Sequence, residues 1–290
     1  MQKFIVSAEN TCDLSQDLLS ELNIRIINLH YYLDGEEYPC ENFDPKAFYT
    51  RLRNGASCST SQPNQEEFRE FFTKTLDEGY DILHLAFSKV LSGTYNNAVA
   101  VANELRPLYP ERKIFVIDTK SQSGGQGLLT ELTARYAMTG ATIEDTYQYA
   151  LDHIQRVNHI FTINDLRSLA KSGRVSHAEA FIGNLLQIKP LLYTDPEGRL
   201  TPYQKVFSRK LSLNGLCDKV KALYDNDCKK IYITHSDCLK DTEYVAEKLR
   251  RIPGVEEVKL FPLNPVIGCH TGADTIAIFF TSADRNVKRG

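Results

Sequence analysis

Short runs of β-branched and aromatic residues alternate with amphipathic segments over the first half of the chain. This alternation predicts strands at residues 3–7, at 82–87 and at 113–117, and one or two strands within 24–33. Helices are expected from Asp44-Pro45 to about Arg53, between Pro63 and Gly79, over 93–105, and after the glycine-rich turn at 124–127 as far as about Gly140. Strands that alternate with helices of this length predict a mostly parallel sheet with crossover helices.

The second half of the chain repeats this alternation with an antiparallel component. A long helical stretch over residues 143–156 leads into a strand at 159–163 and a short helix. Residues 188–193 and 200–206 predict a hairpin around the turn Asp195-Pro-Glu-Gly198. A helix to about Tyr224, a strand at 230–234, a helix to about Arg251 and two final strands follow. We therefore interpret the chain as two α/β domains: residues 1–157 with a mostly parallel sheet and crossover helices, and residues 158–290 with a mixed sheet and helices.

Composition supports this interpretation and narrows the classes of function. The chain has 290 residues, 42% hydrophobic and 24% charged, with a formal net charge of −3, which is typical of a soluble protein with a sizeable core. Nothing in this charge balance indicates a nucleic-acid partner, which would call for a basic stripe. The N-terminus contains three strongly apolar residues in a row, too few for a secretory signal, and no apolar run reaches the roughly 18 residues that span a bilayer.

The seven cysteines show no CxxC spacing, which indicates neither a zinc site nor a redox pair. We expect them to be free thiols in a reducing cytoplasm. They are Cys12, Cys40, Cys58, Cys217, Cys228, Cys238 and Cys269.

Three short stretches place hydroxyl groups beside glycine or proline where a helix is expected to begin: residues 59–63, 91–95 and 268–272. The middle stretch follows an apolar strand, so it lies at the carboxyl end of that strand, where open α/β sheets bind ligands. Unpaired backbone N–H groups at a helix N-terminus suit an anion. The alternative for each stretch is a simple helix cap, which stabilises a helix by about 1 kcal/mol.

Common catalytic motifs are absent from the sequence. There is no GxSxG elbow, and Gly124-Gly-Gln-Gly127 fits neither a dinucleotide fingerprint nor a phosphate loop, so we interpret it as a tight turn with close helix packing. The histidines lack metal-ligand spacing, and no metal or other cofactor is predicted. Cys269 beside His270 suggests a thiol and its base, but adjacent residues rarely face each other in the required geometry.

Short motifs follow one another along the chain: Glu9-Asn-Thr-Cys-Asp-Leu14, Thr60-Ser-Gln-Pro63, Leu91-Ser-Gly-Thr-Tyr95, Asp118-Thr119, Lys171-Ser-Gly-Arg-Val-Ser176, Ile188-Lys-Pro-Leu191 and Pro265-Val-Ile-Gly-Cys-His-Thr-Gly272. In this order they resemble the DegV family of bacterial fatty-acid-binding proteins. The resemblance implies two α/β domains with one long-chain fatty acid, such as palmitate, lying between them. It implies that Thr60 and Ser92 meet the carboxylate, with His270 in the same network and the segment 262–275 returning to this site. Residues expected around them are Ser61, Thr94, Asp118, Arg174 and Thr271.

The resemblance also implies a role. Bacterial members of the family resemble the carrier half of a fatty acid kinase, in which a separate ATP-binding subunit phosphorylates the bound acid. Such a carrier performs no chemistry itself, and it is expected to touch membranes only transiently. Two alternatives stay open: a stand-alone lipid sensor or buffer, and a small-ester hydrolase that uses the same hydroxyls and His270 with Asp118 or Asp274 behind them.

The sequence departs from the family pattern in four places. Glu9-Asn10 replaces Asp-Ser, which puts a role for the first motif in question. Lys89 stands where a second Ser often precedes Leu-Ser-Gly-Thr, and it either attracts the ligand or faces water. Phe207 replaces an Arg and Ala273-Asp274 replaces a Pro-Gly pair, changes expected to affect partner recognition more than ligand binding. The sequence assigns no tunnel-lining residues, acyl-chain preference or oligomeric state.

Overall fold

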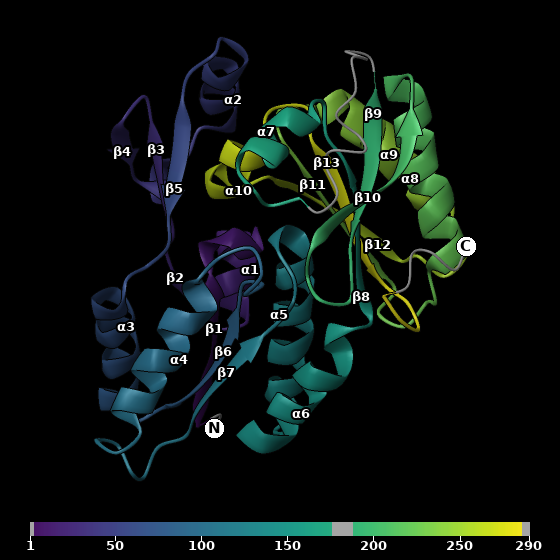
Figure 1. Ribbon diagram of the computed structural model, residues 1–290. Coiled ribbons are helices and arrows are strands. Elements are labelled where there is room, and N and C mark those ends of the chain that lie inside the picture. The colour runs from purple at the N-terminus through teal and green to yellow at the C-terminus, as the bar shows by residue number, and fades with distance from the viewer. Residues whose placement is uncertain (1–2, 176–187, 286–290) are drawn as a thin grey trace.

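The computed structural model describes residues 3–175 and 188–285, which form three sheets with helices packed around them (Figure 1). The first sheet has the strand order β2-β1-β6-β7 and is parallel throughout. One of its faces is covered by α3 and α4 and the other by α5 and α6, which confirms the predicted parallel sheet with crossover helices. The bounds are β1 (Phe4–Glu9), β2 (Arg25–Ile27), β6 (Asp81–Ala86), β7 (Ile114–Asp118), α3 (Gln65–Asp77), α4 (Thr94–Leu105), α5 (Ser123–Met138) and α6 (Ile143–Ile154).

The second sheet has six strands in the order β10-β9-β8-β13-β11-β12. Strands β11 and β12 run parallel, and the other neighbours are antiparallel, which confirms the predicted mixed sheet. Helices α8 and α9 pack on one face of it. The bounds are β8 (Val157–Thr162), β9 (Lys189–Thr194), β10 (Leu200–Val206), β11 (Lys230–His235), β12 (Glu257–Pro262), β13 (Ile276–Thr281), α7 (Leu166–Lys171), α8 (Arg209–Leu223) and α9 (Leu239–Leu249).

Helix α5 lies between these two sheets and packs against strands of both (Figure 1). Its glycines allow this close approach. A Cβ on Gly125 would lie 2.0 Å from Nε2 of His159 on β8, and a Cβ on Gly127 would lie 2.2 Å from the carbonyl oxygen of Cys12. The glycine-rich stretch therefore has the helix-packing role that the sequence indicated, and one continuous apolar cluster includes side chains from both sheets.

The third sheet is small and antiparallel, with the order β4-β3-β5. Helices α2 and α10 pack against it and share one apolar cluster with it. The sheet side contributes Leu29 and Tyr31, α2 contributes Phe48 and Tyr49, and α10 contributes Val266. The sequence prediction missed β4, β5 and the short α1. The bounds are α1 (Gln16–Glu21), β3 (His30–Leu33), β4 (Glu36–Tyr38), α2 (Pro45–Arg53), β5 (Cys58–Ser61) and α10 (Pro265–Thr271), with 3-10 turns at η1 (Asn10–Cys12) and η2 (Cys40–Asn42).

One of the three expected helix starts is wrong. Residues 59–63 do precede a helix: 58–61 form strand β5, and α3 begins after the cap Asn64, whose side chain accepts hydrogen bonds from the N–H groups of Glu66 and Glu67. Residues 268–271 are the end of α10 rather than a beginning, because Asn264 caps that helix and Pro265 is its first residue. Residues 91–95 do precede a helix, α4, as expected.

The boundary between residues 157 and 158 stays a prediction. Strand β8 of the six-stranded sheet begins at Val157, and Ser176 of the Lys171 motif lies outside the described residues. Across residues 3–175 and 188–285, no helix is both long enough and apolar enough to cross a membrane.

Candidate functional site

A cavity of about 550 Å³ lies between the first and second halves of the chain. Its volume is within the roughly 300–1,000 Å³ range of small-molecule sites. The loops after β5 and β6 line one side, and α7, α10 and the start of β10 line the other. The apolar part of the wall includes Leu29, Phe87, Leu91, Leu169, Leu200 and Val266.

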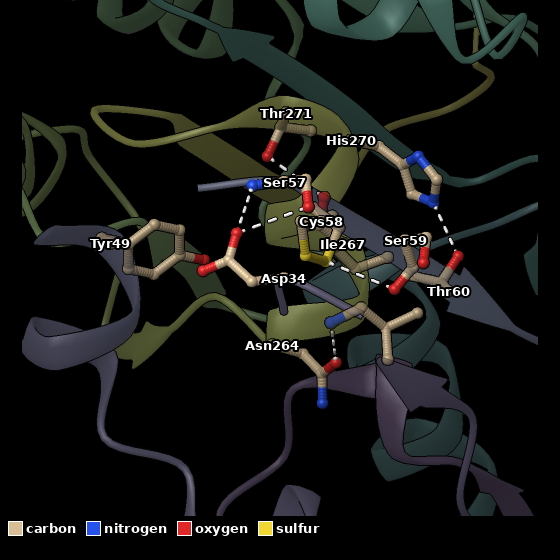
Figure 2. Close-up of a disulfide and its surroundings, with 12 residues drawn as sticks. Asp34, Tyr49, Ser57, Cys58, Ser59, Thr60, Asn264, Ile267, His270 and Thr271 are labelled. Atoms are coloured by element: carbon tan, nitrogen blue, oxygen red, sulfur yellow. Dashed lines mark hydrogen bonds between the residues drawn. A yellow bond between two sulfur atoms is a disulfide. The ribbon is translucent and has the colours of Figure 1, made fainter. Parts of the chain in front are cut away.

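The polar end of the cavity is built where β5 meets α10 (Figure 2). Thr60 on β5 and His270 in the last turn of α10 lie with Oγ1 and Nε2 3.0 Å apart. Burial and, to a lesser extent, the positive charge of Arg174 lower the pKa of His270 to about 4, so the ring is neutral at pH 7. A neutral ring that donates from Nε2 to Thr60 leaves the threonine hydroxyl proton available for an anionic ligand.

Ser92 reaches the same cavity from the start of α4. Its Oγ lies 2.8 Å from Oγ1 of Thr94, accepts a hydrogen bond from the Thr94 N–H at 3.3 Å, and lies 3.4 Å from Oε1 of Gln62. A Cβ on Gly93 would lie 2.7 Å from that Gln62 oxygen, so a larger residue there would displace the end of the Gln62 side chain. Ser92 is therefore a cavity residue whose hydroxyl also accepts from the first N–H of α4, one residue before the cap Gly93, and the positive end of α4 lies behind it.

Cys58 and Cys269 form a disulfide beside this polar end (Figure 2). The expectation of free thiols is wrong for these two residues, while Cys12, Cys40, Cys217, Cys228 and Cys238 are free. The sequence gives no local signal for the pair, since 211 residues separate the two positions. They come together because β5 packs against α10.

Comparisons with known proteins identify the family of this chain. A family model described as "Uncharacterised protein, DegV family" matches residues 3–283. The chain belongs to the DegV family. A DegV domain-containing protein of Clostridium perfringens is 38% identical over 97% of this chain and 98% of its own length. A DegV domain-containing protein of Lactococcus lactis is 32% identical over 96% and 98%.

Solved DegV structures share the two-domain α/β fold. A fatty-acid-binding DegV protein of Thermus thermophilus superimposes with a TM-score of 0.86 at 28% identity, covering 97% of this chain and 99% of that one. A DegV lipid-binding protein of Thermotoga maritima gives a TM-score of 0.83 at 28% identity, with the same coverage. These relatives bind fatty acids or lipids.

The residues that the DegV motifs pointed to fall into two groups. Ser61, Arg174 and Thr271 line the cavity together with Thr60, Ser92 and His270. Thr94 is buried behind the Ser92 hydroxyl. Asp118 does not line the cavity: its Oδ1 accepts hydrogen bonds from the backbone N–H groups of Lys89 at 3.2 Å and Lys120 at 3.1 Å.

The departures from the DegV pattern have distinct structural settings. Glu9 is buried and accepts a hydrogen bond from the Phe87 N–H at 3.0 Å, which fixes the end of β6. Lys89 lines the cavity, and its Nζ lies 3.7 Å from Oδ2 of Asp118. Phe207 is 63% exposed at the start of α8. Asp274 accepts a hydrogen bond from Arg53 at 2.8 Å.

The hydrolase alternative gains no support from this arrangement. Among the described residues, no carboxylate is hydrogen-bonded to His270, and both Asp118 and Asp274 are engaged elsewhere. The sequence reasoning also missed Gln62 and Gln122, which line the cavity. Gln122 lies just before α5, where the turn residues Ser121 to Ser123 are a signal that could have found it.

Proposed function

We propose that this chain binds one long-chain fatty acid, such as palmitate, with its carboxylate at Thr60, Ser92 and His270. A single observation carries the proposal: one cavity joins apolar walls from both halves of the chain to a polar end made of hydroxyls and a neutral imidazole. Its relatives of known structure that bind fatty acids or lipids have the same fold.

The apolar tail supplies most of the affinity. Burying a sixteen-carbon tail at about 0.8 kcal/mol per CH₂ is worth about 12 kcal/mol, from which association and ordering remove several kcal/mol. Each hydrogen bond to the charged carboxylate contributes about 1.5–3 kcal/mol and fixes the orientation of the acid. The head group therefore sets the position of the ligand, and the tail sets the strength of binding.

The same site suits a carrier that presents the carboxylate to a separate ATP-dependent kinase subunit for acyl-phosphate formation. Hydroxyl donors, with Thr60 oriented by the neutral imidazole of His270, leave the carboxylate more nucleophilic than a buried salt bridge would. A polar groove of about 840 Å³ shares Thr60, His270 and Thr271 with the cavity, so the head group is close to solvent and to a docked enzyme. The carrier itself needs no cofactor and no nucleic acid, and it acts in the cytoplasm.

Loading is proposed to involve transient contact with a membrane. Val90 supports this step, since it lines the cavity and is 40% exposed. An apolar side chain at the rim lets the acyl chain enter without crossing a wholly polar surface.

The proposal is tested by denaturing extraction and mass spectrometry of the purified protein, which should release a fatty acid of C14–C18. Ser92→Ala and Thr60→Ala should each weaken fatty-acid binding by about ten- to a hundredfold, the equivalent of one charge-assisted hydrogen bond. Ser20→Ala, on the exposed side of α1, is the matched control and should bind as the parent does. An empty protein with no acyl-chain affinity would contradict fatty-acid binding. If both site variants delivered lipid to the kinase as well as the parent, the head-group assignment would be wrong.

A further inference from the structure

The disulfide joins the same two elements that hold the carboxylate site. Cys58 precedes Thr60 by two residues on β5, and Cys269 directly precedes His270 on α10. The Thr60–His270 hydrogen bond and the Cys58–Cys269 bond are therefore parallel links between one strand and one helix (Figure 2). The Cα atoms of Cys58 and Cys269 are 5.2 Å apart, within the usual range for a disulfide.

Both sulfur-bearing residues are accessible to small molecules. Cys58 and Cys269 are partly exposed, and they line the polar groove of about 840 Å³. The charged residues of the same lining are Arg53, Lys171, Arg174, Asp165 and Asp274. The groove thus offers small thiols and disulfides a path to the pair.

The other cysteines are poorly placed for the same chemistry. Burial raises the pKa of Cys12 to about 12 and that of Cys217 to about 11, and it raises the pKa values of Cys40 and Cys238 to about 11. Burial raises the pKa of Cys228 as well. Such thiols are largely protonated at pH 7, which disfavours their attack on a disulfide.

We propose that Cys58 and Cys269 form a thiol–disulfide exchange site whose oxidation locks β5 to α10 at the carboxylate end of the cavity and slows release of the ligand. A low-molecular-weight disulfide is the oxidant. One protein thiolate attacks it, forms a mixed disulfide and expels one small thiolate. The second cysteine then attacks the protein-side sulfur and expels the other. Two electrons pass from the protein sulfurs to the small disulfide, which becomes two thiols, and a dithiol reverses the reaction.

The effect on the ligand follows from what the link holds together. β5 belongs to the small sheet, whereas α10 connects two strands of the six-stranded sheet. The ligand cavity lies between them, so separating β5 from α10 opens its polar end. The oxidised pair blocks this separation covalently, and the reduced pair leaves the Thr60–His270 hydrogen bond and side-chain packing to resist it. This consequence rests on the proposed fatty-acid function.

The test measures the rate at which labelled palmitate leaves the full-length protein for an excess of phosphatidylcholine vesicles. The unmodified protein is compared after treatment with oxidised glutathione and after treatment with dithiothreitol. Differential alkylation and peptide mass spectrometry report the state of Cys58 and Cys269 in each sample. Release should be at least about tenfold slower from the oxidised protein, because changes at one binding site act mainly on dissociation.

Variants assign the effect to this pair. Cys58→Ser and Cys269→Ser should release palmitate at the fast rate after either treatment. Cys238→Ser is the matched control, since Cys238 caps α9, where serine is a favoured residue, and its release should respond to both treatments as in the parent.

Equal release rates from the unmodified protein in two verified redox states would overturn the proposal, and so would failure of oxidised glutathione to link Cys58 to Cys269. A protein that forms the link but holds no palmitate in either state would instead overturn the proposed fatty-acid function. Comparison of the two states of the unmodified protein does not depend on the folding of any variant.

Discussion

Asp13 is the buried carboxyl group whose titration we expect to dominate the stability of the carboxylate site. Its Oδ1 accepts a hydrogen bond from the Asn264 N–H at 2.9 Å, and its Oδ2 accepts one from the Ser123 hydroxyl. It therefore ties the start of α5 to the cap of α10, the helix that carries His270. Burial raises the pKa of Asp13 to about 7, and the two hydrogen bonds oppose this rise only in part.

The sign and size of the effect follow from this pKa. Below pH 3.8, the ordinary value for this group, Asp13 is protonated in both the folded and the unfolded chain. Between pH 3.8 and about 7 the unfolded chain loses the proton while the folded chain keeps it, so the free energy of unfolding falls as the pH rises. At 1.36 kcal/mol per pH unit, the loss is about 4 kcal/mol and is complete above pH 7.

Asp13→Asn isolates the contribution of Asp13 titration to the free energy of unfolding. The amide keeps an oxygen that accepts from the Asn264 N–H, and it carries no charge. Urea unfolding of parent and variant from pH 4.5 to pH 8.5 gives two stability curves. Groups such as His270 titrate in both proteins and cancel in the difference. Relative to the parent, the free energy of unfolding of the variant should rise by about 3–4 kcal/mol between pH 4.5 and pH 8.5. Asp17→Asn on the exposed side of α1 is the control for losing a carboxyl group alone. A parent-minus-variant difference that stayed constant within about 1 kcal/mol would refute the reasoning.

Two further substitutions test the contacts of α5. Gly125→Ala should lower the free energy of unfolding in urea by about 1–3 kcal/mol, since the new Cβ would overlap the buried His159 ring, and combining it with His159→Ala should cost less than the sum of the two changes. Lys230→Met should cost about 3 kcal/mol at pH 7, because Lys230 donates at 2.7 Å to the buried carboxylate of Glu131. Burial acts to raise the pKa of Glu131, but Lys230 and Arg135 lower it on balance, so this loss should shrink as the pH falls below about 4.5. Lys229→Met, whose exposed pair with Glu256 contributes at most about 1 kcal/mol, is the control; an equal loss in both variants would contradict the buried-pair argument.

The sequence predicted the large elements because burial marks them clearly. β1 and β6 are buried along almost their whole length, so their apolar runs predict central parallel strands. β4 and β5 carry Glu-Glu-Tyr and Cys-Ser-Thr-Ser, and such polar edge strands have no local pattern. α10 was within reach, since Asn264-Pro265 repeats the cap-and-proline signal of Asp44-Pro45 that located α2.

The candidate site was predictable only in part. Ser92 follows a clear strand, and the rule for strand ends placed it near a ligand without any relative in view. Thr60 and His270 came from the family motifs, and their 3.0 Å contact joins residues 210 positions apart. Pairings over such separations are fixed by tertiary packing, which local propensity does not encode; the Cys58–Cys269 link was missed for the same reason.

The position of α5 also bears on how this protein can be divided or recombined. A fragment ending at residue 157 would carry α5 without the β-sheet that faces Gly124 and Gly125, and Glu131 would lose the ammonium group of Lys230. The remaining fragment would expose the apolar face of that sheet to water. A chimera that exchanges halves between homologues must therefore preserve both surfaces that contact α5. The whole chain, rather than either half, is the unit that we expect to fold.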